Sequence, residues 1–213
     1  MIAIDGPSGA GKGTVARKVA ETLGYRHVDT GAMYRAVAWA AVDRGIALDD
    51  EAAVAALADR ARIEIDATRV AIDGADVTTA IRTPVVDGAA SRVARLATVR
   101  AILVAQQRAM AGDGNLVMEG RDIGTNVFPE TDYKFYLDAH IEERTKRRAA
   151  EGVNENLAAR DQRDSQRAAA PLMIALGARV INNSAMTSAQ TSELIINDIK
   201  ARLAQSKQLK TPV

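Results

Sequence analysis

A glycine-rich loop near the start of the sequence carries the residue pattern of a phosphate-binding site. The pattern G-x-x-x-x-G-K follows a short apolar segment, in the run Gly6, Pro7, Ser8, Gly9, Ala10, Gly11, Lys12, Gly13 and Thr14. Glycines let backbone N–H groups converge on phosphate oxygens, and the N-terminus of a following helix adds partial positive charge. Lys12 can reach the β- and γ-phosphates of a triphosphate as a point charge. We therefore expect residues 6–14 to bind ATP, with Lys12 also taking part in catalysis.

The residue after Lys12 departs from the commonest form of this loop. Gly13 stands where Ser or Thr usually supplies a hydroxyl to Mg²⁺, and the hydroxyl comes one position later, at Thr14. Thr14 is thus a candidate direct ligand of Mg²⁺, and we assign no other. The run G-K-G-T is more similar to nucleoside monophosphate kinases than to GTPases, and the chain has no N-K-x-D motif that would read guanine.

A second motif, Asp29-Thr30-Gly31-Ala32-Met33-Tyr34-Arg35, follows the next expected strand. The loops at the carboxyl ends of parallel strands are where α/β sheets bind ligands. Thr30 can cap a helix and also donate to a ligand, and Arg35 lies one turn into that helix. Taken alone, the motif fits a helix cap with an exposed arginine at least as well as it fits a ligand site.

Two later segments combine arginine with aspartate. The run Glu119-Gly120-Arg121-Asp122-Ile123-Gly124-Thr125 follows another expected core strand, which would place it across from the phosphate loop. Taken alone, it also fits a structural ion pair. The run Arg160-Asp161-Gln162-Arg163-Asp164-Ser165-Gln166-Arg167, preceded by Arg144, Arg147 and Arg148, suits neutralisation of a triphosphate by a segment folded over the loop. The competing interpretation is a solvated helix with ion pairs three and four residues apart. The phosphate loop favours the functional interpretation of both segments.

Periodic apolar positions predict the elements that would hold these motifs. Val15, Val19 and Leu23 form a helical stripe that Gly24 ends. Apolar runs predict strands at residues 1–5, 25–28, 115–119, 133–137 and 179–182. The same reasoning predicts helices at residues 12–23, 31–44, 50–61, 85–97, 99–111 and 188–205. Strands that alternate with helices predict an α/β fold of the P-loop NTPase type, with three layers and a five-stranded parallel sheet.

The hydropathy pattern changes after residue 61. Residues 62–66 and 69–73 alternate polar and apolar side chains, and Asp73-Gly74 is a hairpin turn signal. We predict a small antiparallel insertion over residues 62–81.

The composition excludes several classes of protein. The chain has 28 Lys and Arg against 27 Asp and Glu, a net charge of +1, which argues against a coat for polymeric nucleic acid or an anionic membrane. A hydrophobic content of 47% argues against disorder. The absence of Cys excludes a disulfide framework and cysteine-bound zinc, and His27 and His140 are too far apart in the sequence to suggest a metal site. No targeting leader or membrane span is visible, so we expect a cytoplasmic protein.

The motifs, in this order, resemble those of bacterial cytidylate kinases. The resemblance covers nearly the whole chain and rests on GPSGAGKGT, DTGAMYR, the segment near Ile81-Arg82-Thr83, the helix with Ala90-Ser91-Arg92-Val93, EGRDIGTNVFP and RDQRDSQRAAAPL. Adenylate kinases would show D-G-F-P-R after the third strand, where this chain has Gly120-Arg121-Asp122. Shikimate kinases would show Asp-x-Asp after the second, where it has Asp29-Thr30-Gly31.

The resemblance implies a reaction of ATP with CMP or dCMP to give ADP and CDP or dCDP, with Mg²⁺. It implies one kinase domain over residues 1–213, with a monophosphate-binding insertion at 62–81 and a short helical lid at 144–160, both ranges approximate. The partners it implies are small nucleotides and neither polymeric nucleic acid nor a membrane. We expect a monomer.

Carried over residue by residue, the resemblance also implies site residues. Its base and ribose contacts fall on Thr30, Ser91, Arg100, Asp122, Arg160, Asp164 and Arg167. Its phosphate contacts, besides the loop, fall on Arg35 and Arg121. The expected catalytic set is Lys12 with Arg121, Arg147 and Arg160. The position of Thr30 is usually Ser in the family, so the hydroxyl is kept and a methyl group is added.

Cytosine chemistry supports this assignment. Cytosine offers a donor at N4 and acceptors at N3 and O2. Asp122 is the candidate acceptor for N4, with donors from Ser91, Arg100 and Arg167. Uracil has an acceptor at that position, so we predict CMP over UMP by a factor on the order of 10⁴.

Two alternatives remain open: a P-loop kinase for another small acceptor such as UMP, AMP or shikimate, and a module that binds ATP without catalysis. The second would need no monophosphate pocket, so the Arg and Asp residues expected at a second site argue against it.

Overall fold

Five parallel strands form the central sheet of the computed structural model, which describes residues 1–66, 68–112, 114–153 and 156–209. Their order is β2-β6-β1-β7-β8, with bounds Ile2–Asp5 (β1), Arg26–Asp29 (β2), Leu116–Gly120 (β6), Tyr133–Asp138 (β7) and Arg179–Asn182 (β8). All four pairings are parallel, which confirms the predicted sheet. The segments that follow β1, β2 and β6 therefore meet at one edge, and these carry three of the four motifs.

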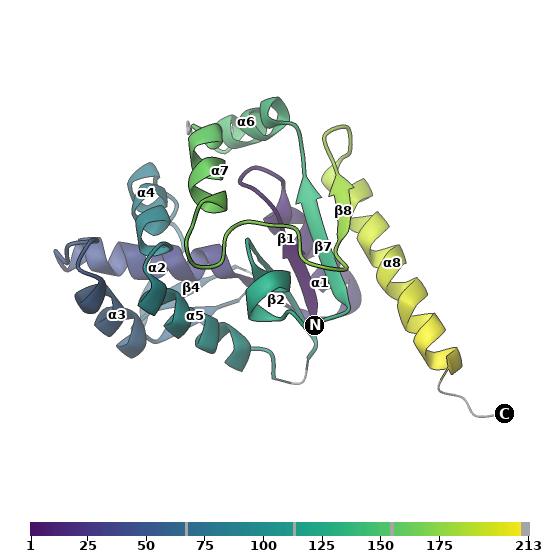
Figure 1. Ribbon diagram of the computed structural model, residues 1–213, viewed down its shortest axis with the longest axis horizontal. Helices are drawn as coiled ribbons and strands as arrows, with labels where there is room; N and C mark the ends of the chain where they lie inside the picture. Colours follow the sequence, from purple (N-terminus) through teal and green to yellow (C-terminus); the bar gives the residue numbers. More distant parts are fainter. Residues whose placement is uncertain (67, 113, 154–155, 210–213) are drawn as a thin grey trace.

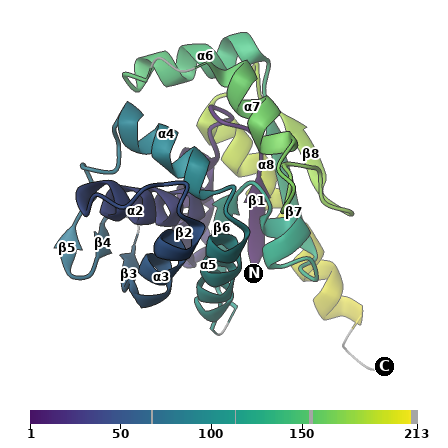
Figure 2. The same cartoon turned by 60° about the vertical axis from the view of Figure 1, so that its left-hand side comes forward.

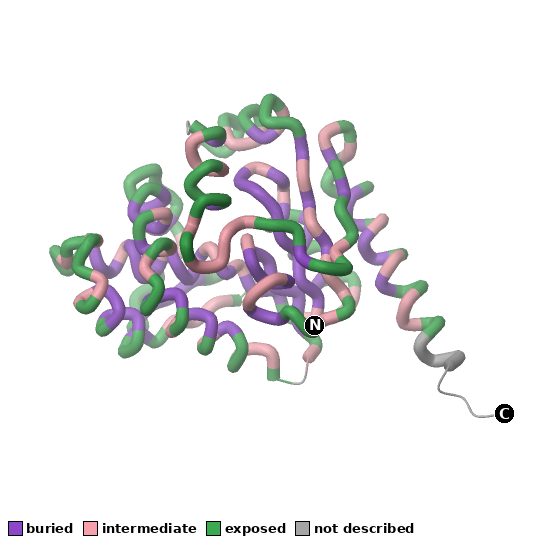
Figure 3. The backbone as a smooth tube through the Cα atoms, in the orientation of Figure 1, coloured by how far each residue is buried: buried purple, intermediate pink, exposed green. Residues whose placement is uncertain are grey.

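Helices cover both faces of this sheet (Figure 1). On one face lie α1 (Lys12–Leu23) and α8 (Ser188–Leu209), and on the other lie α5 (Ala97–Ala109) and the π-helical turn η1 (Ile123–Val127). Alternation along β1 serves both layers, because Ile2 and Ile4 pack with α1 and α8 while Ala3 packs toward α5 and η1. The central strands of this sheet are among the buried segments in Figure 3. The three-layer α/β prediction is confirmed.

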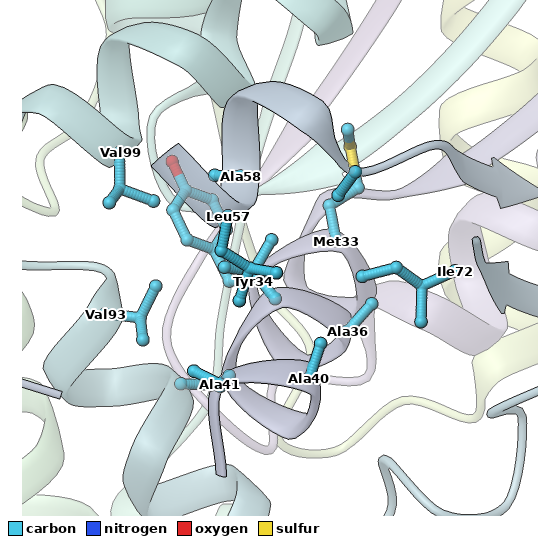
Figure 4. Packing of buried hydrophobic residues seen from close by; sticks show 14 of the residues in the cluster. Met33, Tyr34, Ala36, Ala40, Ala41, Leu57, Ala58, Ile72, Val93 and Val99 are labelled. Carbon is cyan, nitrogen blue, oxygen red and sulfur yellow. The ribbon is translucent and has the colours of Figure 1, made fainter. Parts of the chain in front are cut away.

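A second hydrophobic core lies beside the sheet. It joins α2 (Thr30–Asp43), α3 (Glu51–Arg60), α4 (Pro84–Val93) and α5 with the antiparallel strands β3 (Ile63–Ile65), β4 (Val70–Ile72) and β5 (Ala75–Asp76). Figure 4 shows Ala40 and Ala41 of α2 in this core, with Val93 and Val99 nearby. Small side chains on α2 let its neighbours approach closely. The predicted antiparallel sheet is present, and its role in binding a monophosphate stays a prediction.

The charged segment after β7 forms two helices, α6 (Ile141–Ala150) and α7 (Leu157–Ser165). Both lie over the loop that follows β1 (Figures 1 and 2). Within the expected lid, residues 154 and 155 fall outside the described part of the chain. Across the described residues, no helix combines the length and the apolar character needed to cross a bilayer.

Capping residues set the N-terminal ends of α2 and α4, which therefore differ by one residue from the predicted starts. The side chain of Asp29 accepts a hydrogen bond from the N–H of Ala32 at 3.0 Å, so α2 begins one residue early, at Thr30. Thr83 caps α4 in the same way and Pro84 is its first residue, a position where a missing N–H costs nothing.

Candidate active site

A cavity of about 280 Å³ opens at the carboxyl edge of the sheet. Its walls come from the phosphate loop, α2, α4, the segment after β6, and α6 and α7, which surround the loop in Figure 2. Among the described residues that line it, nine are Lys or Arg and six are Asp or Glu. The chain as a whole carries only +1, so positive charge is concentrated at this cavity.

The phosphate loop is fixed by contacts from α6. Gly9 has φ +75°, and a Cβ there would lie 2.7 Å from the backbone oxygen of Arg144, so neither the conformation nor the packing admits a side chain. Arg144 is buried and donates to the backbone oxygen of Ser8 at 3.1 Å and to Asp161 at 2.7 Å. Arg144 therefore stabilises the loop from α6 and does not line the cavity.

Lys12 lies at the base of the cavity and is 6% exposed. Its ammonium donates to the backbone oxygen of Pro7 at 2.8 Å. Burial and the nearby guanidinium of Arg121 lower the pKa of Lys12 to about 7. The charged form is thus costly until an anion binds, and a triphosphate in the loop would stabilise it.

Arg35 of α2 lines the same cavity as the phosphate loop. Arg35 donates to the carboxylate of Asp29 at 2.7 Å, and its Nε is buried with no hydrogen-bond partner among the described residues. Arg82 approaches the same carboxylate at 3.9 Å. Thr30 donates its hydroxyl hydrogen to the backbone oxygen of Glu119 at 2.7 Å. The guanidinium of Arg35 is therefore held in place with donor capacity to spare, as a phosphate site requires.

A buried ion pair forms the far wall of the cavity. Arg100 donates to Oδ2 of Asp122 at 2.5 Å and stacks over the ring of Tyr34, 5.5 Å from its centroid. Asn126 donates to the same Oδ2 at 3.2 Å. Both bonds go to Oδ2, so the carboxylate of Asp122 is fixed through one oxygen, and the described residues show no hydrogen bond to Oδ1.

Arg121 connects the phosphate loop with α7. It donates to the backbone oxygen of Gly6 at 3.0 Å and to Asp164 at 2.9 Å, and Arg167 donates to Asp164 at 2.8 Å. Burial alone would raise the pKa of Asp164, but the guanidinium groups of Arg121 and Arg167 outweigh it and hold the pKa below its usual value. These groups form a charged network between the two ends of the cavity.

The structure brings most of the predicted site residues together. Those that line the cavity are Ser8, Gly9, Gly11, Lys12, Gly13, Thr14, Thr30, Arg35, Ser91, Arg100, Arg121, Asp122, Arg160, Asp164 and Arg167. Gly6, Pro7 and Ala10 belong to the same loop but are not among the lining residues. Ser91 donates to the backbone oxygen of Asp87 at 3.1 Å, so it must release that bond before it can donate to a base.

Arg147 and Arg163, like Arg144, lie outside the cavity lining. Arg147 donates to the side-chain and backbone oxygens of Asn183 at 3.0 and 2.9 Å, next to Gly11 of the loop. Arg163 is exposed, and its Nε donates to the backbone oxygen of Ala159 at 3.2 Å. The expectation that the whole run from Arg144 to Arg167 faces one cleft is therefore wrong, because Arg144, Arg147 and Arg163 do not line the cavity. Arg144 is held by Ser8 and Asp161, whereas Arg163 donates to the backbone of its own helix, α7.

Sequence reasoning named Arg148 within the charged run but missed its partner Asp87, and it also missed Asp5. Arg148 of α6 donates to Asp87 of α4 at 2.9 Å and so joins the two sides of the cavity mouth. Asp5 accepts from the N–H groups of Ile123 and Gly124 at 2.8 and 2.7 Å, which anchors η1 below Asp122. Burial raises the pKa of Asp5 to about 6. Its place at the end of β1 was a usable signal, whereas nothing in the spacing links Asp87 to Arg148.

A phosphate loop with a buried lysine, facing a second anion subsite and a fixed carboxylate in one cavity, defines a P-loop kinase of the nucleoside monophosphate kinase class. Comparison with known proteins is more specific. The family model described as cytidylate kinase matches residues 2–201. The chain belongs to the cytidylate kinase family.

Several curated proteins are similar to the chain over most of its length. It is 46% identical to the cytidylate kinase of Pelotomaculum thermopropionicum, over 94% of this chain and 96% of that protein. It is 42% identical to the cytidylate kinase of Caldanaerobacter subterraneus, over 93% and 94%. It is also 46% identical to a bifunctional pantoate ligase/cytidylate kinase of a Synechocystis species, over 92% of this chain and 42% of that longer protein.

Proposed function

We propose that this protein transfers the γ-phosphoryl group of ATP to CMP or dCMP and releases ADP and CDP or dCDP. Family membership supports the reaction. The structural observation that carries it is the single cavity in which Lys12 of the loop faces both the phosphate subsite at Arg35 and the Arg100–Asp122 pair. An enzyme that joins two nucleotides by phosphoryl transfer must hold both at once, and this cavity offers the charges for both.

The chemistry needs positioning and charge neutralisation more than a base. A phosphate oxygen of CMP is already anionic, so it can attack the γ-phosphorus without prior removal of a proton. Lys12 would bind the donor phosphates and Arg35 the acceptor phosphate, while Arg121 is tied to the loop at Gly6 and can stabilise charge between them. Arg160, which lines the cavity from α7, and Arg147, beside Gly11, are the proposed lid contributions.

The site fits Mg²⁺ with ATP. The carboxylate of Glu119 and the hydroxyl of Thr14 both line the cavity next to Lys12, and oxygen groups of this kind are what Mg²⁺ prefers. The described residues hold no cluster of three or more His, Cys, Asp or Glu that could bind a metal by themselves, which suits an ion held mainly by the substrate phosphates and water. When bound, Mg²⁺ neutralises charge that develops on the phosphates during transfer.

Water exclusion is the proposed role of the segment at 144–160. Its helix α6 packs on Gly9 and reaches α4 through the ion pair of Arg148 with Asp87. A closed cavity would prevent transfer of the phosphoryl group to water. The antiparallel segment at 62–81 is proposed to support the acceptor side through α2, against which β3 and β4 pack.

The remaining expectations depend on this function. We propose a monomeric enzyme in the cytoplasm, where ATP and CMP are both substrates of metabolism. Small nucleotides are its proposed partners in place of polymeric nucleic acid, since the positive charge is concentrated in one cavity and is not spread over a surface.

An acceptor panel tests this proposal. Formation of ADP and of the diphosphate product is measured with ATP, Mg²⁺ and CMP, dCMP, UMP, AMP or shikimate. We expect rapid CDP and dCDP formation, with kcat/KM for CMP exceeding that for UMP by a factor on the order of 10⁴. A preference for UMP, AMP or shikimate would establish a kinase for another acceptor. ATP binding with no turnover for any acceptor would establish a non-catalytic module.

A further inference from the structure

A buried histidine contacts a carboxylate that faces the phosphate loop. Nε2 of His27, on β2, lies 3.2 Å from Oε1 of Glu119, on β6. His27 is 8% exposed and Glu119 is 6% exposed. The strands are paired with His27 opposite Val117, which puts the two side chains in diagonal positions on one face of the sheet. Neither the phosphate loop nor the acceptor subsite uses His27 directly.

The carboxylate of Glu119 occupies space that Gly13 leaves open. A Cβ at Gly13 would lie 3.1 Å from Oε1 and 3.7 Å from Oε2 of Glu119. Gly13 is the position where the commonest phosphate loops carry the hydroxyl that binds Mg²⁺. In this chain the carboxylate of Glu119 lies beside Gly13. Its negative charge also favours the charged form of Lys12.

Such a carboxylate needs a partner that fixes it. A glutamate side chain has three rotatable bonds, and the phosphates of ATP would repel its negative charge. An ionised carboxylate only accepts hydrogen bonds, so the imidazole must donate through Nε2–H. Nδ1 of His27 is buried and has no partner in the described part of the chain, so the Glu119 contact is the one hydrogen bond shown for this ring.

We infer that His27 is a positioning residue for metal-dependent ATP binding: it holds the carboxylate of Glu119 beside Gly13, where that carboxylate can bind the water shell of Mg²⁺. The inference rests on the proposed function, specifically on the binding of ATP together with Mg²⁺. Partners that orient a metal-binding side chain commonly change metal affinity by about 10-fold or more when removed. The effect of His27 should therefore appear in the metal dependence and not in the binding of CMP.

The test compares His27→Leu with His27→Gln. Leucine removes the donor, whereas the glutamine amide nitrogen can take the place of Nε2. The midpoint of thermal unfolding is measured without nucleotide, with ATP alone, and with ATP at increasing Mg²⁺. We expect His27→Leu to need about 10-fold more Mg²⁺ for half of the metal-dependent stabilisation, and His27→Gln to stay near wild type. His140→Gln, at the other histidine of the chain, is the matched control and should not differ from wild type.

The outcomes separate the inference from the proposed function. A purely structural role for His27 would lower the midpoint without nucleotide and leave the half-saturating Mg²⁺ concentration unchanged, which would overturn the inference. An equal shift in His27→Gln and His27→Leu would also overturn it. If His27→Leu does not fold, His27→Asn replaces it, because the shorter amide cannot reach Glu119 and the same 10-fold shift is expected. CDP formation by the wild-type enzyme tests the proposed function independently.

Discussion

Replacing Lys12 with methionine should lower kcat by about 10³-fold without unfolding the protein. Lys12 is the cation nearest the base of the phosphate loop, and its ammonium is already aimed into that loop by the bond to Pro7. Methionine fills similar volume but supplies no charge to the phosphates in the transition state. The measurement is steady-state CDP formation at saturating ATP and CMP. A Lys12→Met enzyme with near wild-type turnover would contradict the role given to this residue.

The same substitution should make the free protein at least as stable as wild type. Burial puts the pKa of Lys12 at about 7 in the folded protein, below its usual value of 10.5. Between these values the unfolded chain binds more protons, so the free energy of unfolding of the wild type rises with pH across this window. Below pH 7 the full cost of burying the charge is present. Methionine removes that cost, so its stabilising effect should be largest near pH 7 and smaller near pH 9.

Thermal unfolding of both proteins without nucleotide, at pH 7 and at pH 9, checks this expectation. A Lys12→Met midpoint well below that of the wild type at pH 7 would show that the lysine is needed for the fold, and the loss of kcat could then not be assigned to chemistry. Conflict between stability and activity at one buried residue is common at sites built to bind charge.

Replacing Asp122 with asparagine should remove most of the preference for CMP over UMP. The carboxylate can accept from N4 of cytosine through Oδ1, since its two observed bonds both use Oδ2. Asparagine can turn its amide toward the ligand and donate to O4 of uracil while its oxygen still accepts from Arg100. We expect kcat/KM for CMP to fall by about 10³-fold and the ratio of CMP to UMP to fall by at least as much.

Asparagine is preferred to alanine for this test because of Arg100. Alanine would leave a buried guanidinium without its charged partner, a loss that commonly costs about 3–5 kcal/mol of stability. Asp132→Asn, the same change at an exposed aspartate, is the matched control and should leave both acceptors unaffected. If the ratio of kcat/KM for CMP to that for UMP is unchanged in Asp122→Asn, Asp122 does not recognise the base and other side chains must set the preference.

Much of the fold could be predicted because each core strand is a short apolar run that ends at a motif. The run before Gly6 became β1, and the alternation after Ala61 became the antiparallel sheet. The segment after β7 could not be resolved into α6 and α7, because charged residues dominate it and apolar residues are few. The segment after β6 forms η1, because Asp5, far away in the sequence, accepts hydrogen bonds from its first N–H groups.

The site was harder to predict than the fold. Residue type identifies an arginine but does not show what it will contact. Arg144 and Arg148 are one turn apart on α6, yet Arg144 supports the loop and Arg148 closes the cavity mouth on Asp87. The relation between Gly13 and Glu119 likewise exists only in three dimensions, where a strand end meets the start of α1. The net charge of the chain, +1, also gave no sign of a cavity in which basic groups outnumber acidic ones.

The central claim is that both nucleotides react in the one cavity between the phosphate loop and the Arg100–Asp122 pair. A compound in which adenosine and cytidine are joined through five phosphates between their 5′ carbons tests it most directly. If the two sites are adjacent, this compound should compete with ATP and with CMP, and bind at least about 10²-fold more tightly than ATP alone. Competition with ATP only, or affinity no greater than that of ATP, would contradict the claim.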